Sequence, residues 1–367
     1  MKIVLTGGGT GGHIYPALAI GRYCQQQEPN TELLYIGSDT GLERDIVPKA
    51  GVAFEAIRVS GFRRKVSLSN LQTVWHFVRA VSRSKNLLRR FKPDVVIGTG
   101  GYVCGPVMYA AAQLNIPTMI HEQNVLPGLT NRFLSRYADV AAVSFPGGEK
   151  YFTKSPKVVY TGNPRASEVI HANPVAARER LGIKNDVPIV VFVGGSRGAR
   201  ALTELMIAMA PLWQVEETFQ VVYVTGAPYY ETTVTKIQKH IDKLKGKLIV
   251  VPYVDQFPDL LAASSLVVCR SGASSIAELT AFGIPSIQVP SPNVTNNHQE
   301  ANARRLVEAG AAEMVLERDL HAINLSMRIR KLMGVSPELL KMRESAKAIG
   351  KPDSAQVIYE LIREMKK

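Results

Sequence analysis

KIVLTGGGTGGHIYPALAI, residues 2–20 of the chain, decides the fold. The apolar run at 2–6 leads into a glycine-rich turn at 7–13, and we expect a helix over 15–27 after it. A buried parallel strand, a glycine turn and a helix in this order are typical of doubly wound α/β folds. Glycines let the backbone approach an anion, and the N-terminus of the helix presents free N–H groups to it. The stretch therefore predicts a phosphate-binding turn.

The same plan recurs along the 367 residues. Further short strands, each bounded by Gly, Pro or Asp, are expected at 32–36, 94–97, 118–120, 140–143 and 157–160. A second glycine turn at 194–199 follows a strand at 187–193 and precedes a helix at 199–210. Strands at 220–225, 248–251, 266–269 and 286–289 and a last helix at 354–365 complete the pattern. The spacing predicts two Rossmann-like domains, 1–163 and 164–351, with 352–367 packing back on the first.

Charge and cysteines limit the class of protein. The formal net charge is +13, and ten lysines and arginines, with no acid, lie between Glu55 and Asp94. Such an excess suits nucleic acid, anionic lipid, anionic small substrates or a merely solvated face. No nucleic-acid-binding motif is present. Three scattered cysteines fit a reducing cytosol, and the chain shows neither a signal-peptide core nor a run able to span a bilayer.

One predicted helix leaves two interpretations open. Its apolar residues at helical spacing are Leu71, Val74, Trp75, Val78 and Val81, and Arg79, Arg83 and Arg90 share another face. Either the stripe faces the core and the basic side is solvated, or the basic side, with Phe62 and Leu68 from the preceding loop, meets anionic lipid headgroups.

A nicotinamide-dependent oxidoreductase is an alternative. Gly7-x-Gly9-x-x-Gly12 satisfies the dinucleotide fingerprint, and Asp39 has the place of its ribose-binding acid. The surplus glycines, the terminal His13 and the second glycine turn weigh against it. A nucleotide sensor without catalysis is the third candidate, and the missing Gly-Lys-Ser/Thr ending argues against a P-loop enzyme.

Single polar residues at strand ends are candidates for the site. His13 begins a helix at the presumed cleft and suits a base or an anion ligand. Glu278 is either a ribose ligand or an ordinary solvated helix glutamate. Polar loops at 121–124 and 296–299 follow strands where open α/β sheets bind ligands, and they suit sugar hydroxyls. No Asp-x-Asp pair supports a bound divalent metal.

Five motifs occur in order: GGGTGGHIYPA at 7–17, HEQN at 121–124, TGNPR at 161–165, GGSRGA at 194–199 and CRSGA at 269–273. They resemble the MurG family of peptidoglycan N-acetylglucosaminyltransferases over essentially the whole chain. The resemblance implies a GT-B fold, with two Rossmann-like domains facing an interdomain cleft. It implies an inverting transfer of GlcNAc from UDP-N-acetylglucosamine to the MurNAc C4 hydroxyl of lipid I, undecaprenyl-diphospho-MurNAc-pentapeptide. The product is lipid II, and neither a cofactor nor a tightly bound metal takes part.

The resemblance also implies roles for individual residues. The donor is expected to contact Ser196 at the UDP phosphates, the Val254 backbone at the uracil and Glu278 at the ribose. Arg165 and Arg270 are expected close to the donor, with Ala273 and Gln299 near the sugar hydroxyls. The acceptor side is expected to comprise Thr10, Gly11, Gly12, His13 and Asn124. His13 is the first choice for the base, with a role as ligand of the acceptor diphosphate left open.

The lipid acceptor implies a place in the cell. We expect a peripheral protein on the cytoplasmic face of the bacterial membrane, held by its basic belt to an anionic surface. Other cell-wall synthesis proteins are compatible partners, and nucleic acid is not expected. This assignment connects the chain with cell wall biogenesis, cell shape and cell division.

Overall fold

The computed structural model describes residues 1–59, 69–184, 186–195, 197–215, 217–334 and 336–366, with the backbone alone at 69–72 and 74. The chain forms two compact units, the first made of 1–168 and 351–367 and the second of 169–350. The division follows Glu168, five residues after the boundary that the turn residues predict. Lys351 and the last helix belong to the first unit.

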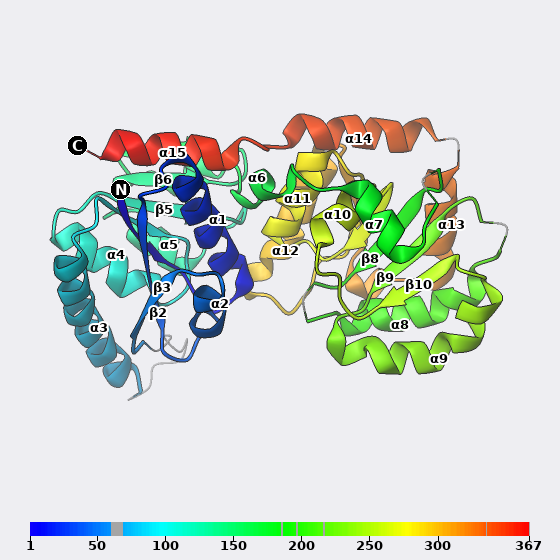
Figure 1. Cartoon of the computed structure of the whole chain (residues 1–367), viewed down its shortest axis with the longest axis horizontal. Coiled ribbons are helices and arrows are strands. Elements are labelled where there is room, and N and C mark those ends of the chain that lie inside the picture. Colours follow the sequence, from blue (N-terminus) through cyan, green and yellow to red (C-terminus); the bar gives the residue numbers. More distant parts are fainter. Residues whose placement is uncertain (60–68, 185, 196, 216, 335, 367) are drawn as a thin grey trace. The chain divides into compact units, whose positions relative to one another are not determined.

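The first unit is a seven-stranded sheet between two layers of helices (Figure 1). The strand order is β3-β2-β1-β4-β5-β6-β7, and all pairs are parallel. The strands are β1 Lys2–Thr6, β2 Glu32–Ser38, β3 Ala53–Ile57, β4 Val95–Gly98, β5 Thr118–Glu122, β6 Val140–Val143 and β7 Lys157–Tyr160. The helices are α1 Gly11–Gln27, α2 Glu43–Lys49, α3 Ser69–Phe91, α4 Cys104–Gln113, α5 Leu129–Leu134, α15 Ser354–Met365 and, across the division, α6 Arg165–Val169.

Both faces of this sheet carry a core, because its central strands are apolar on both sides. Ile3 and Leu5 point into one core, and Val4 and Val96 into the other. The returning helix α15 contributes Ile358, among others, to the first of these cores, where it packs along α1 (Figure 1). Successive side chains of a strand point to opposite faces, so a strand buried on both faces is apolar at nearly every position.

Helix α3 is amphipathic, but its buried face differs from the predicted stripe. Ala80, Leu87 and Leu88 are buried in the core. Trp75 and Val78 are 54% and 61% exposed, so the interpretation in which the whole stripe faces the core is wrong. Val81 of the same stripe packs partly against the core. The side chains of Leu71 and Val74, like Phe62 and Leu68, lie outside the described part of the chain. Polar Ser84 is also fully buried. The buried face of the helix therefore differs from the face that its apolar residues indicate.

The second unit is a six-stranded parallel sheet of order β10-β9-β8-β11-β12-β13. It also has a core on each face. Its strands are β8 Ile189–Val193, β9 Gln220–Val224, β10 Leu248–Val251, β11 Leu266–Cys269, β12 Ser286–Gln288 and β13 Ala312–Met314. Its helices are α7 Pro174–Leu181, α8 Arg200–Met209, α9 Tyr230–Lys243, α10 Phe257–Ala263, α11 Ala273–Phe282, α12 His298–Glu308, α13 Ala322–Met333 and α14 Pro337–Ile349.

The strands predicted from the sequence occur within two residues of their expected ends. Two strands were not predicted, β3 and β13, and both lie at a sheet edge. Most residues of β3 and β13 are exposed or half-buried, so neither strand needs the apolar run by which the buried strands were predicted. Helix α1 begins at Gly11, four residues before the predicted start, because glycines 11 and 12 already form its first turn.

Candidate active site

The strand order places one site at each sheet. In the first unit the order reverses between β1 and β4, and in the second between β8 and β11. Ligands of open α/β sheets bind beyond the carboxyl ends of the strands at such a reversal. The loops at these points are residues 7–13 and 99–103 in the first unit, and residues 194–199 and 270–272 in the second. Each unit therefore has a candidate site built around its own glycine turn.

His13 lies in the first turn of α1 with its ring orientation set by the backbone. Its Nδ1 is 2.9 Å from the carbonyl oxygen of Gly8 and 3.4 Å from Oγ1 of Thr10. A carbonyl oxygen only accepts hydrogen bonds, so Nδ1 must carry the proton. The neutral ring then keeps its lone pair on Nε2, and none of the described residues forms a hydrogen bond with that atom. The arrangement leaves Nε2 ready to accept a proton.

The loop after β4 locks the first glycine turn in place. The Gly8 N–H donates to the carbonyl of Gly100 over 3.1 Å, and Thr99 Oγ1 donates to the carbonyl of His13 over 2.8 Å. A side chain on Gly100 would meet the His13 ring, with its Cβ 2.9 Å from Cδ2. Gly101, at φ +88°, would overlap the Gly8 carbonyl. These glycines are needed for close approach as well as for positive φ.

Asn124 is held beside this turn by a buried carboxylate at the end of β5. One oxygen of Glu122 accepts from the Asn124 N–H at 3.0 Å, and the other accepts from Nδ2 of Asn131 at 2.9 Å. Glu122 itself is 3% exposed. Asn131 Nδ2 also lies next to the Cβ position of Gly100. Thr10, Gly11, Gly12, His13 and Asn124 therefore all lie beyond the carboxyl ends of the strands in the first unit.

His121, in the same strand, is a structural histidine rather than part of the site. Its ring is fully buried, and burial lowers its pKa from 6.5 to about 4. Nε2 donates to the Gly162 carbonyl at 3.0 Å, and Nδ1 accepts from Nε2 of Gln123 at 3.0 Å. The neutral ring thus fastens the TGNPR turn to the end of β5.

Arg165 belongs to the first unit, not to the second with most of the predicted donor residues. It forms an ion pair with Glu168, which also accepts from Nε of Arg22 at 2.7 Å. Its guanidinium lies 5.8 Å from the centre of the Tyr15 ring on α1. Arg165 therefore lies beside Tyr15, the residue two positions after His13 in α1.

In the second unit, the glycine turn after β8 is built in the same way as the first. Gly195 and Gly198 have φ of +89° and +70°. A Cβ on Gly198 would overlap the Thr225 carbonyl, so the turn packs tightly on the end of β9. Helix α8 begins directly after it without a side-chain cap, which leaves its first N–H groups to an outside acceptor. Ser196 lies outside the described residues.

The loop and helix after β11 hold three of the predicted donor residues. Ala273 begins α11, and Glu278 lies one and a half turns later. Glu278 is 6% exposed, so the interpretation as an ordinary solvated glutamate is wrong. Arg270 donates to the Val289 carbonyl at 3.1 Å and pairs with Glu317 at 2.5 Å. This guanidinium thus braces the loop after β12.

The last two predicted donor residues are Val254, in the loop after β10, and Gln299, at the start of α12. Val254 follows β10 and packs partly against the core. Gln299, in the first turn of α12, accepts from the Ser291 N–H at 2.8 Å. Within the described residues, no three His, Cys, Asp or Glu side chains gather as metal ligands would. None of the helices described is long and apolar enough to cross a bilayer.

Comparison with known proteins agrees with this geometry. The family model for the glycosyltransferase family 28 N-terminal domain matches residues 3–143, and that for its C-terminal domain matches 189–358. The chain belongs to glycosyltransferase family 28. Relatives from Bacillus cereus (47% identical) and Halalkalibacterium halodurans (49% identical) match over the full length of this chain and of their own. Each is named UDP-N-acetylglucosamine--N-acetylmuramyl-(pentapeptide) pyrophosphoryl-undecaprenol N-acetylglucosamine transferase, and the Bacillus cereus protein carries the number 1 after this name. A crystal structure of MurG from Acinetobacter baumannii matches with a TM-score of 0.79 at 28% identity, covering 99% of both chains.

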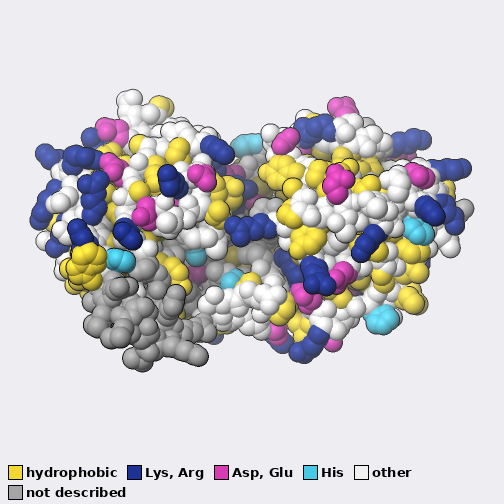
Figure 2. All heavy atoms as spheres, turned by 90° about the horizontal axis from the view of Figure 1, so that it is seen from below, with side chains coloured by type: hydrophobic (Ala, Val, Ile, Leu, Met, Phe, Trp, Pro, Cys, Tyr) yellow, Lys and Arg dark blue, Asp and Glu magenta, His cyan; other side chains and the backbone are white. Residues whose placement is uncertain are grey.

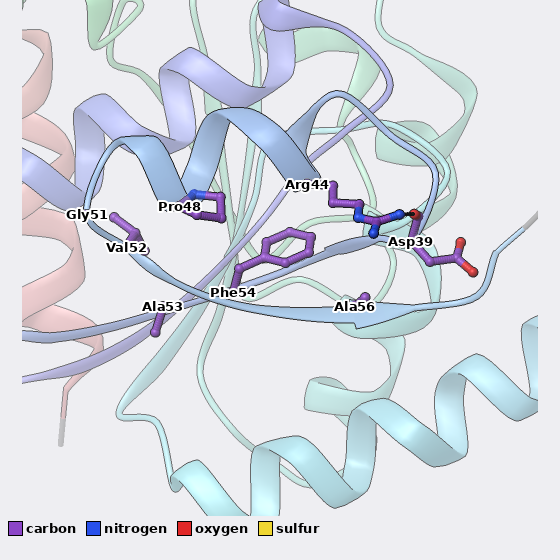
Figure 3. A pocket seen from close by; sticks show the side chains of 8 residues that line it. All are labelled: Asp39, Arg44, Pro48, Gly51, Val52, Ala53, Phe54 and Ala56. Atoms are coloured by element: carbon purple, nitrogen blue, oxygen red, sulfur yellow. Dashed lines mark hydrogen bonds between the residues drawn. The ribbon is translucent and has the colours of Figure 1, made fainter.

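The family 28 assignment confirms the GT-B fold and the resemblance drawn from the five motifs. It also removes the oxidoreductase alternative. Asp39, its candidate ribose ligand, lines a pocket beside α2 and β3, together with Arg44 and Phe54 (Figure 3). Arg44 Nη1 donates to the Asp39 carbonyl there at 3.3 Å. The pocket belongs to the edge of the sheet and not to its centre, where a dinucleotide would bind.

The sequence did not point to Glu43, which contacts the glycine turn of this family 28 protein. Its Oε2 accepts from the Gly9 N–H at 3.1 Å, and Oε1 accepts from the Ser38 N–H at 3.0 Å. A buried acid 34 residues away along the chain has no local signal.

Proposed function

We propose that this protein transfers N-acetylglucosamine from UDP-N-acetylglucosamine to the C4 hydroxyl of MurNAc in lipid I, which forms lipid II with inversion at the anomeric carbon. The names of relatives that match the whole chain at 47–49% identity support both substrates. The observation that carries the chemistry is the ring of His13, whose Nδ1 faces the Gly8 carbonyl and whose Nε2 is left to accept a proton.

In this proposal, His13 is the general base. Nε2 removes the proton of the acceptor hydroxyl while the oxygen attacks the anomeric carbon and the bond to the UDP oxygen breaks. Thr10, Gly11, Gly12 and Asn124 surround the acceptor. The uncapped first turn of α1 offers N–H groups that suit the acceptor diphosphate.

The donor residues of the proposal lie mainly in the second unit. Negative charge develops on UDP as it leaves, and the helix N-termini after β8 and β11 stabilise it. The buried carboxylate of Glu278 suits ribose hydroxyls, and Val254 and Ser196 complete the nucleotide site. Ala273 and Gln299 lie near the sugar. Arg165 and Arg270 act close to the diphosphate, although both already have carboxylate partners.

We further propose that the first unit docks on an anionic membrane surface at the cytoplasmic face. Trp75 and Val78 are exposed on α3, and the Arg79 guanidinium lies 4.4 Å above the Trp75 ring. Figure 2 shows Lys and Arg side chains gathered at the edge of the first unit where α3 lies in Figure 1. Exposed aromatic and basic side chains on one helix face suit a headgroup layer. Cell-wall synthesis proteins on the same surface are compatible partners.

The test is transfer of labelled GlcNAc from its UDP donor to a short-chain lipid I analogue in the presence of EDTA. We expect a β-linked product. His13→Ala should lower kcat about 10²–10⁴-fold because the general base is lost. His171→Ala, the same change at an exposed histidine, should leave kcat unaltered. A His13→Ala enzyme only a few-fold slower than wild type would reject the role of base.

A further inference from the structure

A single peptide group lies between Glu43 and His13. Its N–H belongs to Gly9 and donates to Oε2 of Glu43 at 3.1 Å. Its carbonyl belongs to Gly8 and is 2.9 Å from Nδ1 of His13. The two ends of a trans peptide point in opposite directions within one plane. The carboxylate and the imidazole therefore bind opposite ends of the same rigid group.

The position of Glu43 is built rather than incidental. Its side chain is fully buried, and its second oxygen accepts from the Ser38 N–H at 3.0 Å. Three glycines leave room for it: side chains on Gly8 and Gly41 would overlap its carboxylate, and a Cβ on Gly37 would lie 2.7 Å from its Cγ. Burying a carboxylate is costly unless hydrogen bonds compensate. The core would accept an apolar residue more easily, so the charge needs another explanation.

We propose that Glu43 is a positioning residue for the base, acting on His13 through the Gly8–Gly9 peptide. The inference rests on the proposed role of His13. The carboxylate fixes the plane of the peptide and polarises it, so that the Gly8 carbonyl becomes a stronger acceptor. The stronger acceptor keeps the proton on Nδ1 and the lone pair on Nε2.

The arrangement also favours the charged ring that the reaction forms. When Nε2 takes the proton of the acceptor hydroxyl, positive charge develops on the imidazole. The polarised carbonyl stabilises that charge, as a directly bonded carboxylate does in a Ser-His-Asp triad. No proton reaches Glu43, which keeps both of its backbone donors throughout.

The first experiment measures kcat and KM for Glu43→Gln, which replaces one accepting oxygen with an NH₂ group. We expect kcat to fall about 10- to 100-fold, as when partners that orient metal-bound histidines are lost. KM for both substrates should stay within about twofold, because binding contacts remain. Asp45→Asn removes a charge from the exposed face of the same helix and should have no effect. Glu43→Asp keeps the charge, and its kcat should lie between those of wild type and Glu43→Gln.

A double-mutant cycle asks whether Glu43 acts through His13. In the His13→Ala background, Glu43→Gln should change the residual rate less than about twofold. Ring ¹⁵N spectra of histidine-labelled protein give a readout independent of activity, with the His13 signals assigned by their loss in His13→Ala. The wild type should show the Nδ1–H tautomer, and Glu43→Gln should shift the population toward Nε2–H.

Three outcomes would overturn the inference: a wild-type kcat in Glu43→Gln, an undiminished effect in the His13→Ala background, or an unchanged tautomer. Failure of the proposed function looks different. In that case His13→Ala itself transfers GlcNAc as fast as wild type, or the wild type makes no lipid II analogue. If Glu43→Gln does not fold, the tautomer and kcat of Glu43→Asp decide the question.

Discussion

The buried ring of His121 predicts how the first unit responds to acid. Burial lowers the pKa of this ring from 6.5 to about 4. Between these values the unfolded chain binds a proton on His121 that the folded chain does not bind. The free energy of unfolding must therefore decrease as the pH falls through this window. Protonation would also break the bond that Nδ1 accepts from Gln123.

The magnitude follows from the two pKa values. Each unit of difference corresponds to about 1.4 kcal/mol, so the neutral ring contributes about 3 kcal/mol to the stability of the first unit at neutral pH. This contribution is complete above pH 6.5 and is lost by about pH 4. It is a large share of the roughly 5–15 kcal/mol that stabilises a typical domain.

His121→Gln isolates this contribution. A glutamine can donate to the Gly162 carbonyl and accept from Gln123, as the neutral ring does, but it does not titrate. Hydrogen exchange of β5 amides, corrected for intrinsic rates, reports the free energy of opening of the first unit. We expect the loss between pH 7 and pH 4 to be about 3 kcal/mol smaller in the variant than in wild type.

Two internal comparisons support the measurement. Amides of β11 report on the second unit and should respond equally in both proteins. His171→Gln, at an exposed site, should behave like the wild type. Parallel pH dependences of β5 in wild type and His121→Gln would refute the reasoning, because the ring would then titrate alike in the folded and unfolded chains.

Two further predictions concern the first glycine turn and the membrane. Gly101→Ala forces a side chain into the Gly8 carbonyl at φ +88°, and we expect displacement of the turn to cost about 100-fold in kcat. Gly51→Ala, at φ +75° with open space around it, should reduce stability by about 1–3 kcal/mol without affecting kcat. Equal kcat values in the two variants would contradict the idea that the loop after β4 holds the glycine turn in place. Trp75→Ala and Arg79→Ala should weaken binding to anionic vesicles, measured by co-sedimentation. The loss of binding free energy should be about 1 kcal/mol for the arginine at low salt, whereas Arg200→Ala in the second unit should leave binding unchanged. Vesicle binding that ignores both salt and anionic lipid would exclude the docking surface.

Much of the fold is encoded locally. Short apolar strands, each ending at Gly, Pro or Asp, predicted all the central strands, because a strand buried on both faces needs only a run of a few apolar residues. The two glycine turns lie where the sequence predicted them, whereas the polar segments predicted as loops at 121–124 and 296–299 belong partly to β5 and α12. Their order along the chain also indicated two sheets, since consecutive βα units usually lie next to each other in one sheet.

Helix α3 shows the limit of such patterns. Trp75 and Val78 continue an apolar stripe at helical spacing, yet both are exposed, and Ser84 is buried in their place. Periodicity shows that a helix is amphipathic, but an apolar face can meet a core, a membrane or a partner with the same spacing. The neighbours of α3 decide between them.

The sequence by itself determined the strands, the glycine turns, the motifs of the family and the position of His13 at a helix start. Only the tertiary structure decided which atoms surround His13. Gly100 and Gly101 lie in the loop after β4, and Glu43 begins α2, which follows β2. Both segments meet the first turn because β4 and β2 flank β1 in the sheet. Local spacing is set by the geometry of a few consecutive residues, whereas contacts across 34 or more residues depend on strand order. Strand order is settled by packing of the whole sheet, so the support of the base could not be read from the chain.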